Sequence, residues 1–188
     1  MSFDGSDDYV SVSDPGTDSI LDFSAGDSIT ISTWIRPSSL SADYRNIITK
    51  ERTVAVDNSN YSLGVGDGAS FRSRPRFYYR NSADTTWHVY RSGIDISVNQ
   101  WSHLVVTYIF GTGSSLTMYI NGAAVSGSYS AGDGTNAPFE SNNPLWIGAI
   151  NTAGGTAVDE PFNGLIDEVR VYNRALSASE VQQLYNSR

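Results

Sequence analysis

The chain has 188 residues, of which 39% are hydrophobic, 12% aromatic and 17% charged, and its formal net charge is −8. It contains no cysteine, which excludes disulfides and thiolate metal sites, and its negative charge argues against nonspecific binding to nucleic acid. No apolar run approaches the roughly 20 residues of a membrane-spanning helix. With 17 glycines and few charges, the composition favours many short strands joined by tight turns, folded as one domain over residues 1–188.

The first half of the chain shows the alternation that is typical of strands. Ile29, Ile31, Thr33 and Ile35 fall on one face of a predicted strand, and mostly polar residues fall on the other. Further strands are expected near Tyr9–Val12, Asn46–Lys50, Tyr61–Val65, Arg76–Arg80 and Trp87–Arg91.

A hairpin and a helix are the strongest local signals in the second half. Asn121-Gly122 stands between two predicted strands, and a type I′ turn needs the positive φ that these residues tolerate. Ser177 and Glu180 form a capping-box pattern before an apolar stripe, which predicts one short C-terminal helix. Strands are also expected over Leu104–Ile109, Leu116–Ile120, Ala123–Val125, Leu145–Ala149 and Leu165–Tyr172, and loops over Ala131–Asn143 and Asn151–Asn163.

Three segments, taken in order, carry a more specific pattern. They are Phe3–Val10, then Trp101–Val105 with Met118–Gly122, and finally Leu145–Gly148 with Phe162–Ser177. Together they resemble the laminin-G-like, concanavalin A-like jelly-roll family, to which the pentraxins are related. The resemblance implies an all-β, two-sheet antiparallel sandwich whose first and last strands are adjacent. It also implies an extracellular or cell-surface module of a larger protein, although one fold hosts many functions.

The strand adjacency implied by the resemblance would place Asp4 near Asp167, where related folds often hold a calcium ion. Ca²⁺ takes roughly six to eight oxygen ligands, which carboxylates and backbone carbonyls beside a glycine turn can supply. We therefore expect a structural calcium ion bound by Asp4 and Asp167. The alternative is that Asp4 caps a turn and that Asp167 and Glu168 pair with Arg170 or Arg174.

A rival site lies in the edge loops. Asp57 and Asn58 resemble the paired Asp-Asn ligands of the pentraxins, which bind their ligands through calcium. The later half of the pentraxin site is an acidic, amide-rich run after an Ile-Gly strand, whereas here Asn151 alone offers a suitable oxygen. Asp159 and Glu160 can reach in from the same loop. We expect one calcium ion or none at this edge.

Catalysis has no support in the sequence. A glycosidase of this fold needs two carboxylates flanking the scissile bond, and no Glu begins the Glu-x-Asp-x-x-Glu pattern of the laminarinases. The Gly-x-Ser-x-Gly nucleophile motif and the Gln-Ile-His strand of the polysaccharide lyases are also absent. His103 stands where a structural strand residue is normal in the family. We expect no enzymatic activity; a diverged polysaccharide hydrolase or lyase is the least favoured reading.

The segment Phe71–Ser92 is the most uneven in charge. It holds Arg at five positions, aromatic residues between them, and a single acid, Asp84. If Arg76–Arg80 and Trp87–Arg91 pair as strands, one face offers guanidinium groups and phenols that suit a carboxylate or sulfate on a sugar. The predicted ligand residues are Arg76, Tyr78, Arg80, His88 and Tyr90.

The leading functional hypothesis is a non-catalytic, lectin-like module that binds a polysaccharide or glycoconjugate, with an anionic glycan among the options. The alternative is a protein-interaction or adhesion module of a surface or virion protein. A nucleic acid partner is not expected, because phosphates would be repelled by the negative chain.

Overall fold

The computed structural model describes residues 1–16, 19–53, 56–82, 86–140, 142–151 and 158–188, and for residues 51–53 and 56–58 it describes the backbone alone. The strands are β1 (Ser2–Asp4), β2 (Val10–Val12), β3 (Ser28–Pro37), β4 (Arg45–Thr53), β5 (Val56–Val65), β6 (Pro75–Arg80), β7 (Trp87–Ser92), β8 (Ser102–Ile109), β9 (Thr117–Ile120), β10 (Ala123–Val125), β11 (Gly127–Ala131), β12 (Leu145–Ile147), β13 (Ile150–Asn151), β14 (Val158–Asp159) and β15 (Asn163–Tyr172). A 3₁₀ turn, η1, covers Gly113–Ser115, and the helix α1 covers Ala178–Asn186.

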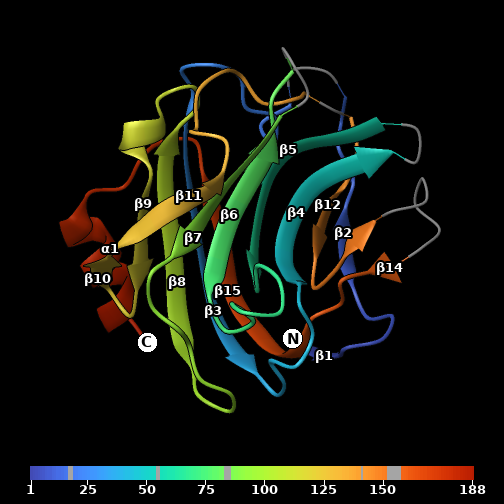
Figure 1. Ribbon diagram of the computed structural model, residues 1–188, viewed down its shortest axis with the longest axis vertical. Coiled ribbons are helices and arrows are strands. Elements are labelled where there is room, and N and C mark those ends of the chain that lie inside the picture. The colour runs from blue at the N-terminus through green and yellow to red at the C-terminus, as the bar shows by residue number, and fades with distance from the viewer. Residues whose placement is uncertain (17–18, 54–55, 83–85, 141, 152–157) are drawn as a thin grey trace.

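Two antiparallel sheets form the body of the molecule, and the seven-stranded sheet lies in front of the six-stranded sheet in Figure 1. The six-stranded sheet has the order β1-β15-β3-β8-β9-β10, and the seven-stranded sheet has the order β11-β7-β6-β5-β4-β12-β2. A separate two-stranded ribbon joins β13 to β14. The two-sheet jelly-roll sandwich implied by the sequence is confirmed.

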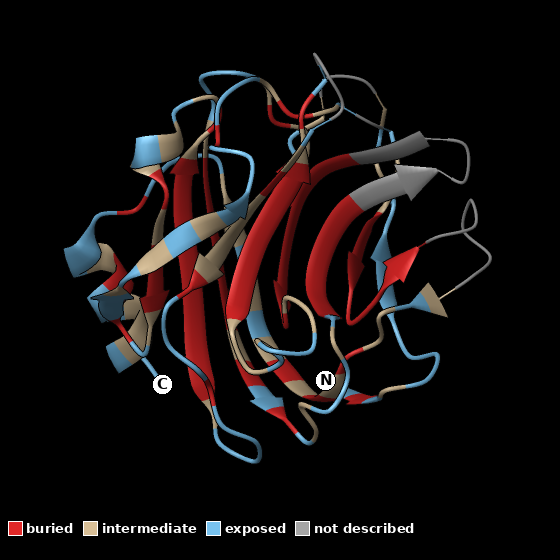
Figure 2. Cartoon of the chain, in the orientation of Figure 1, coloured by how far each residue is buried: buried red, intermediate tan, exposed pale blue. Residues whose placement is uncertain are grey.

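The apolar core lies between the two sheets. Ile29, Ile31 and Ile35 of β3 are fully buried and belong to one cluster with Phe77 and Tyr79 of β6. Figure 2 shows buried residues along the central strands of both sheets and exposed residues mainly in the loops and on α1. The alternating isoleucines of β3 are therefore the side chains that face the core.

The first strand of the chain lies beside the last one, as predicted. In β1 and β15, Ser2 pairs with Leu165, and Phe3 pairs with Gly164. The expected opening strand Phe3–Val10 is nevertheless divided, because a turn at Gly5 (φ +83°) sends β2 to the far edge of the other sheet, beside β12.

The hairpin and the helix are confirmed. Asn121 (φ 53°) and Gly122 (φ 78°) adopt the positive φ of the predicted turn between β9 and β10. Ser177 and Glu180 form the reciprocal capping box at the start of α1. The buried side chain of Val181 packs α1 against the outer side of the six-stranded sheet, beside Val105. Among the described residues, no helix has the length and apolar character needed to cross a bilayer.

Candidate functional site

The register of β1 against β15 separates the two aspartates that were predicted to share a calcium ion. Asp4 lies opposite Asn163, four residues before Asp167 on β15, which is about 13 Å at roughly 3.3 Å per residue. Asp167 accepts the backbone N–H of Glu168 with one oxygen and pairs with Arg188 at 3.3 Å through the other. The structure therefore does not bring Asp4 and Asp167 together, because their strands are adjacent but their positions are staggered.

Asp7 and Asp8 are the carboxylates that gather around Asp4. One oxygen from each of the three lies within 4.8 Å of the others, and all three residues are exposed. Asp4 accepts the backbone N–H of Ser6 at 2.8 Å, and Asp8 accepts that of Asp4 at 2.9 Å, so the turn is fixed by its own carboxylates. Two oxygens on opposite sides of a calcium ion lie about 4.8 Å apart, so the spacing fits that ion.

The second candidate is the outer face of β6 and β7, which we call the β6–β7 face. Residues opposite one another in an antiparallel pair point to the same side of the sheet. The pairs Arg76–Arg91, Tyr78–Val89 and Arg80–Trp87 therefore make up this face, while the alternate residues point into the core. Trp87 is half-buried and has Arg80 over its ring at 5.5 Å and Tyr78 tilted against it at 5.8 Å.

The structure places two residues of the predicted ligand set on the opposite side of the sheet from Arg76, Tyr78 and Arg80. His88 lies opposite Tyr79, and Tyr90 lies opposite Phe77, so both belong to the core side. His88 accepts the backbone N–H groups of Asp133 and Gly134 with Nδ1, at 3.1 and 2.9 Å. Its ring also stacks on Tyr79 at 4.8 Å. It holds a turn in place and is not available to a ligand. A shift of one residue in the register between two strands moves every side chain to the other face of the sheet. In the observed register Trp87, and not its neighbour His88, lies on the face with Arg80.

A polar network holds the inner part of the β6–β7 face. Tyr78 donates its hydroxyl to Asn46 Oδ1 at 2.9 Å, and Asn46 Nδ2 donates to Glu160 Oε2 at 2.8 Å. Arg76 donates to the same oxygen of Glu160 at 2.9 Å. The guanidinium of Arg76 also lies between two phenol rings, 4.5 Å from Tyr44 and 4.4 Å from Tyr78. These side chains are held in one arrangement by several partners each.

The network joins the two sites that the sequence presented as rivals. Glu160, placed in the edge-loop site, is the partner of Arg76, placed in the sheet-face site. Asp159 is exposed at the end of β14, whereas Asn151 is 3% exposed on β13. The side chains of Asp57 and Asn58 lie outside the described residues, although their backbone belongs to β5.

Most of the arginines near this face are already paired with acids. The pairs are Arg72–Asp43 at 2.7 Å, Arg74–Asp95 at 3.5 Å, Arg76–Glu160 at 2.9 Å and Arg91–Asp67 at 2.7 Å. A guanidinium that has a carboxylate partner offers less attraction to an anionic ligand. The surface is therefore aromatic and polar, and its charges are largely balanced.

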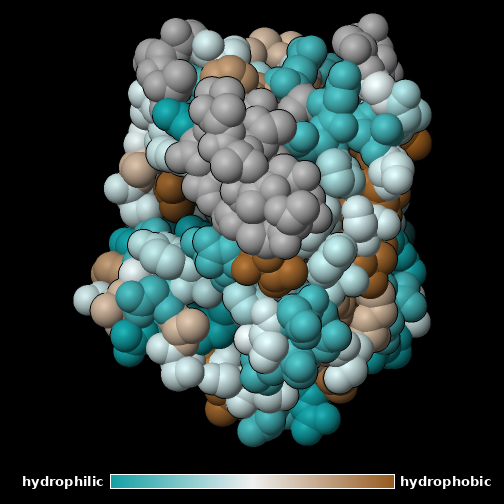
Figure 3. Space-filling view, turned by 90° about the vertical axis from the view of Figure 1, so that its right-hand side faces the viewer, coloured by the Kyte–Doolittle hydropathy of each residue, from teal (hydrophilic) through white to brown (hydrophobic). Residues whose placement is uncertain are grey.

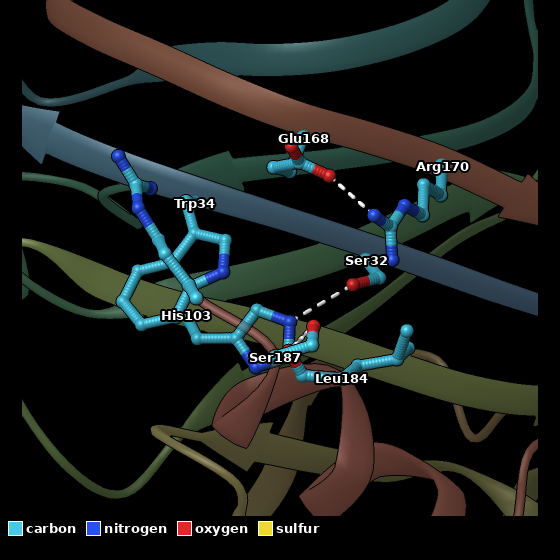
Figure 4. Close-up of a pocket in the computed structure, with 8 residues that line it drawn as sticks. Ser32, Trp34, His103, Glu168, Arg170, Leu184 and Ser187 are labelled. Atoms are coloured by element: carbon cyan, nitrogen blue, oxygen red, sulfur yellow. Dashed lines mark hydrogen bonds and ion pairs between the residues drawn. The ribbon is translucent and has the colours of Figure 1, made fainter.

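A small cavity lies on the other side of the molecule, between the six-stranded sheet and the end of α1 (Figure 4). Its volume is about 100 Å³, which is below the roughly 300–1,000 Å³ of typical small-molecule sites. His103 lines it, bonded to Ser32 Oγ at 2.9 Å and stacked on Trp34 at 5.1 Å. Its Nδ1 has no hydrogen-bond partner in the described part of the chain. Burial, with a smaller contribution from Arg170, lowers the pKa of His103 to about 4.

Sequence reasoning missed Asn46, Tyr44 and Trp87 as members of the candidate site. Asn46 stands in a predicted strand. Its contact with Glu160 depends on the path of the chain through β13 and β14, which no local sequence pattern predicts. Trp87 did carry a signal, since it is a large aromatic residue at the start of a predicted strand. Only the register of β6 against β7 shows that it shares a face with Arg76 and Tyr78.

Comparison with known proteins gives one curated relative. The chain is 30% identical over 172 residues to Paraclostridial mosquitocidal protein 1 of Paraclostridium bifermentans, a match that covers 89% of this chain and 13% of that protein. The chain therefore spans a small part of the length of this relative.

Solved structures that share the fold include the following two. Domain 4 of AbnA, a GH43 extracellular arabinanase from Geobacillus stearothermophilus in complex with arabinotriose, is 23% identical with a TM-score of 0.60, covering 94% of this chain and 72% of that one. The binding domain of botulinum neurotoxin serotype D is 16% identical with a TM-score of 0.67, covering 98% of this chain and 41% of that one. The family model of the concanavalin A-like lectin/glucanases superfamily matches residues 4–182. The chain belongs to this superfamily.

Proposed function

We propose that the chain is a non-catalytic carbohydrate-binding module of a larger extracellular or surface protein. Its ligand would be a neutral sugar chain bound on the β6–β7 face. The observation that carries the proposal is the half-buried ring of Trp87, backed by Tyr78 and bordered by the fixed network of Arg76, Asn46 and Glu160.

The chemistry of this face suits a sugar ring. Carbohydrate recognition combines an aromatic surface, which covers the apolar side of the ring, with a few polar groups held in fixed positions. Side chains that are already ordered lose little conformational entropy on binding. A neutral sugar is favoured over an anionic one, because the arginines around the face have carboxylate partners.

The superfamily relationship supports the same class of function. One structure with this fold holds arabinotriose, and another is described as a binding domain. Both are under 25% identical to this chain, so arabinotriose is a starting point for experiments on this one.

The test is a glycan array that includes arabino-oligosaccharides, followed by calorimetric titration of the strongest ligand. Trp87→Ala should weaken binding roughly ten-fold or more, equivalent to about 1.4 kcal/mol. Tyr9→Ala is the matched control, because Tyr9 is an aromatic residue 44% exposed at the opposite edge of the same sheet. Recovered oligosaccharide should be intact. Equal affinity of wild type and Trp87→Ala would remove the β6–β7 face from consideration.

We also propose that a structural calcium ion binds at the turn after β1. Asp4, Asp7 and Asp8 would hold the ion, and Asp167 would not, given the stagger of β1 and β15. We expect calcium to raise the melting temperature, with a chelator reversing the effect and Asp7→Asn abolishing it. Asp167→Asn, the control, should respond to calcium as the wild type does. An identical melt with calcium and with chelator would end the proposal.

Protein interaction is the second candidate, and one observation favours it. The outer strand β2 exposes Val10 and Val12 at 38% and 43%, and Tyr9, just before it, is 44% exposed. Figure 3 looks onto this side of the sandwich, where hydrophobic residues form small separate patches among hydrophilic ones. Exposed apolar residues on an edge strand can pair with another chain. A protein partner that binds the wild type but not Val10→Lys, in a variant that still binds glycan, would identify this function.

A further inference from the structure

Lys50 of β4 is buried with two carboxylates, away from the β6–β7 face. Its side chain is 0% exposed, and its Nζ lies 2.5 Å from Asp14 Oδ2 and 3.0 Å from Asp22 Oδ1. The side chains of Asp14 and Asp22 are themselves 0% and 8% exposed. Both aspartates lie in the connection between β2 and β3, so this connection meets the middle of β4 here.

The surroundings of this cluster are apolar and aromatic. The cross-strand neighbours of Lys50 are Tyr61 on β5 and Leu145 on β12, both buried. Phe23, next to Asp22, packs edge-on against Tyr61 at 5.4 Å. One ammonium and two carboxylates are costly in such a place, because burial disfavours charge. A reaction that converts an ammonium and a carboxylate into a neutral amide removes two of these charges.

The groups are arranged as an amine, an electrophile and a proton carrier. Asp14 presents Oδ2 to Lys50, while its Oδ1 accepts the backbone N–H of Gly16 at 2.8 Å. That N–H stabilises negative charge on Oδ1 when a nucleophile adds to Cγ. Asp22 lies beside Nζ, where it can accept a proton and return it. The 2.5 Å contact holds Nζ against Oδ2, the oxygen bonded to the carbon that the amine would attack.

We propose that Lys50 and Asp14 condense into an intramolecular amide bond, with Asp22 as the proton carrier. Asp22 takes a proton from the ammonium of Lys50 and passes it to Oδ2 of Asp14. Nζ then adds to Cγ of Asp14. A second proton moves from Nζ through Asp22 to Oδ2, the bond between Cγ and Oδ2 breaks, and one water leaves. Asp22 ends as the carboxylate it was, and no oxidant or cofactor is consumed.

The bond would cross-link the segment before β3 to the middle of β4. A covalent link between residues 14 and 50 reduces the freedom of the unfolded chain and resists loss of the segment that carries Asp14. The inference does not depend on sugar binding, since the cluster shares no residue with the β6–β7 face.

Mass spectrometry of the purified chain tests the proposal. The intact mass should be one water below the sequence mass. Trypsin does not cleave the Arg36–Pro37 bond, so it should yield residues 1–45 joined to residues 46–52, with fragmentation placing the link between Asp14 and Lys50. Wild-type protein that has the full sequence mass and lacks this joined peptide would overturn the proposal.

Two variants separate this bond from other losses of water. Asp-Gly sequences such as Asp67-Gly68 lose water by cyclising to a succinimide, which would persist in Lys50→Met and would join no peptides. Lys50→Met should have its full sequence mass. Asp22→Asn keeps the amine and the electrophile but removes the proton carrier, so it should accumulate as the unlinked form. A water loss unchanged in Lys50→Met would overturn the assignment.

Discussion

At the scale of single residues, the two histidines show how position in the sheet decides a role. His88 Nδ1 accepts hydrogen bonds from the backbone N–H groups of Asp133 and Gly134 and so fixes the turn at these residues. His103 is 1% exposed and has one ring nitrogen without a partner in the described chain, so burial dominates its chemistry. Both carry structural roles, and neither lies on the β6–β7 face.

The buried imidazole of His103 makes the stability of the fold depend on pH. Its pKa is about 4 in the folded protein, below the ordinary value of 6.5, so the unfolded chain binds a proton at a higher pH than the folded one. The free energy of unfolding should therefore fall as the pH drops from about 6.5 to about 4, by at most about 3 kcal/mol from this residue. Urea denaturation at several pH values measures it.

His103→Gln is the control for that experiment, since it keeps a polar side chain that does not titrate. Wild type and variant should differ less as the pH approaches 4, because only the wild type loses this stability. Parallel pH profiles over the whole window would contradict the assignment.

The candidate site was predictable from sequence only in part at this scale. Alternation correctly placed Arg76, Tyr78 and Arg80 on one face of β6. It did not give the register of β7, so His88 was chosen in place of its neighbour Trp87. Nor did it show that Glu160 would return across the sheet to pair with Arg76, because that contact joins residues 84 positions apart.

At the scale of elements, strong local patterns were reliable and weak ones were not. The long alternating strands β3 and β8 and the capped helix α1 lie where they were expected. The strand β11, Gly-Ser-Tyr-Ser-Ala, lacks branched residues and exists through its pairing with β7. The two-residue strand β13 lies at the start of the predicted loop Asn151–Asn163 and β14 lies within it, since so short a ribbon leaves no periodic pattern.

Gly148 tests how β1 is attached to the rest of the sandwich. Its φ is +91°, and a Cβ there would lie 2.2 Å from the ring of Phe3, which is 4% exposed in the core. Gly148→Ala should therefore lower the free energy of unfolding by about 2–4 kcal/mol, through backbone strain and displacement of Phe3. Chemical denaturation followed by fluorescence measures the change.

Gly26→Ala is the matched control for Gly148→Ala. Gly26 has a similar φ of +85°, but a Cβ there meets nothing within 4 Å. It should cost only the strain of the left-handed backbone, about 1–2 kcal/mol. Equal losses in the two variants would show that Phe3 does not depend on the space that Gly148 leaves.

At the scale of the whole molecule, the fold follows from bringing the two ends of the chain into one sheet. β1 and β15 are neighbours, and β2 crosses to the opposite sheet, so the first twelve residues contribute to both layers. The family resemblance carried by the three sequence segments implied this closure. It could not predict the stagger that separates Asp4 from Asp167, because adjacency of strands does not fix their register.

In the closed sandwich, the outer side of the seven-stranded sheet carries both the Trp87 ring and the fixed polar network of Arg76, Asn46 and Glu160. The formal net charge of −8 is distributed so that the acids near this surface pair with arginines. A neutral ligand can approach such a surface without long-range repulsion. The proposed sugar binding depends on this one face of the sandwich.

The most direct test of sugar binding on the β6–β7 face is an NMR titration of the ¹⁵N-labelled chain with the strongest ligand from the glycan array. Signals of the Trp87 indole and of the backbone at Tyr78, Asn46 and Glu160 should shift together and saturate. Failure of the whole glycan panel to bind, or shifts confined to the turn of Asp4, Asp7 and Asp8, would contradict sugar binding on the β6–β7 face.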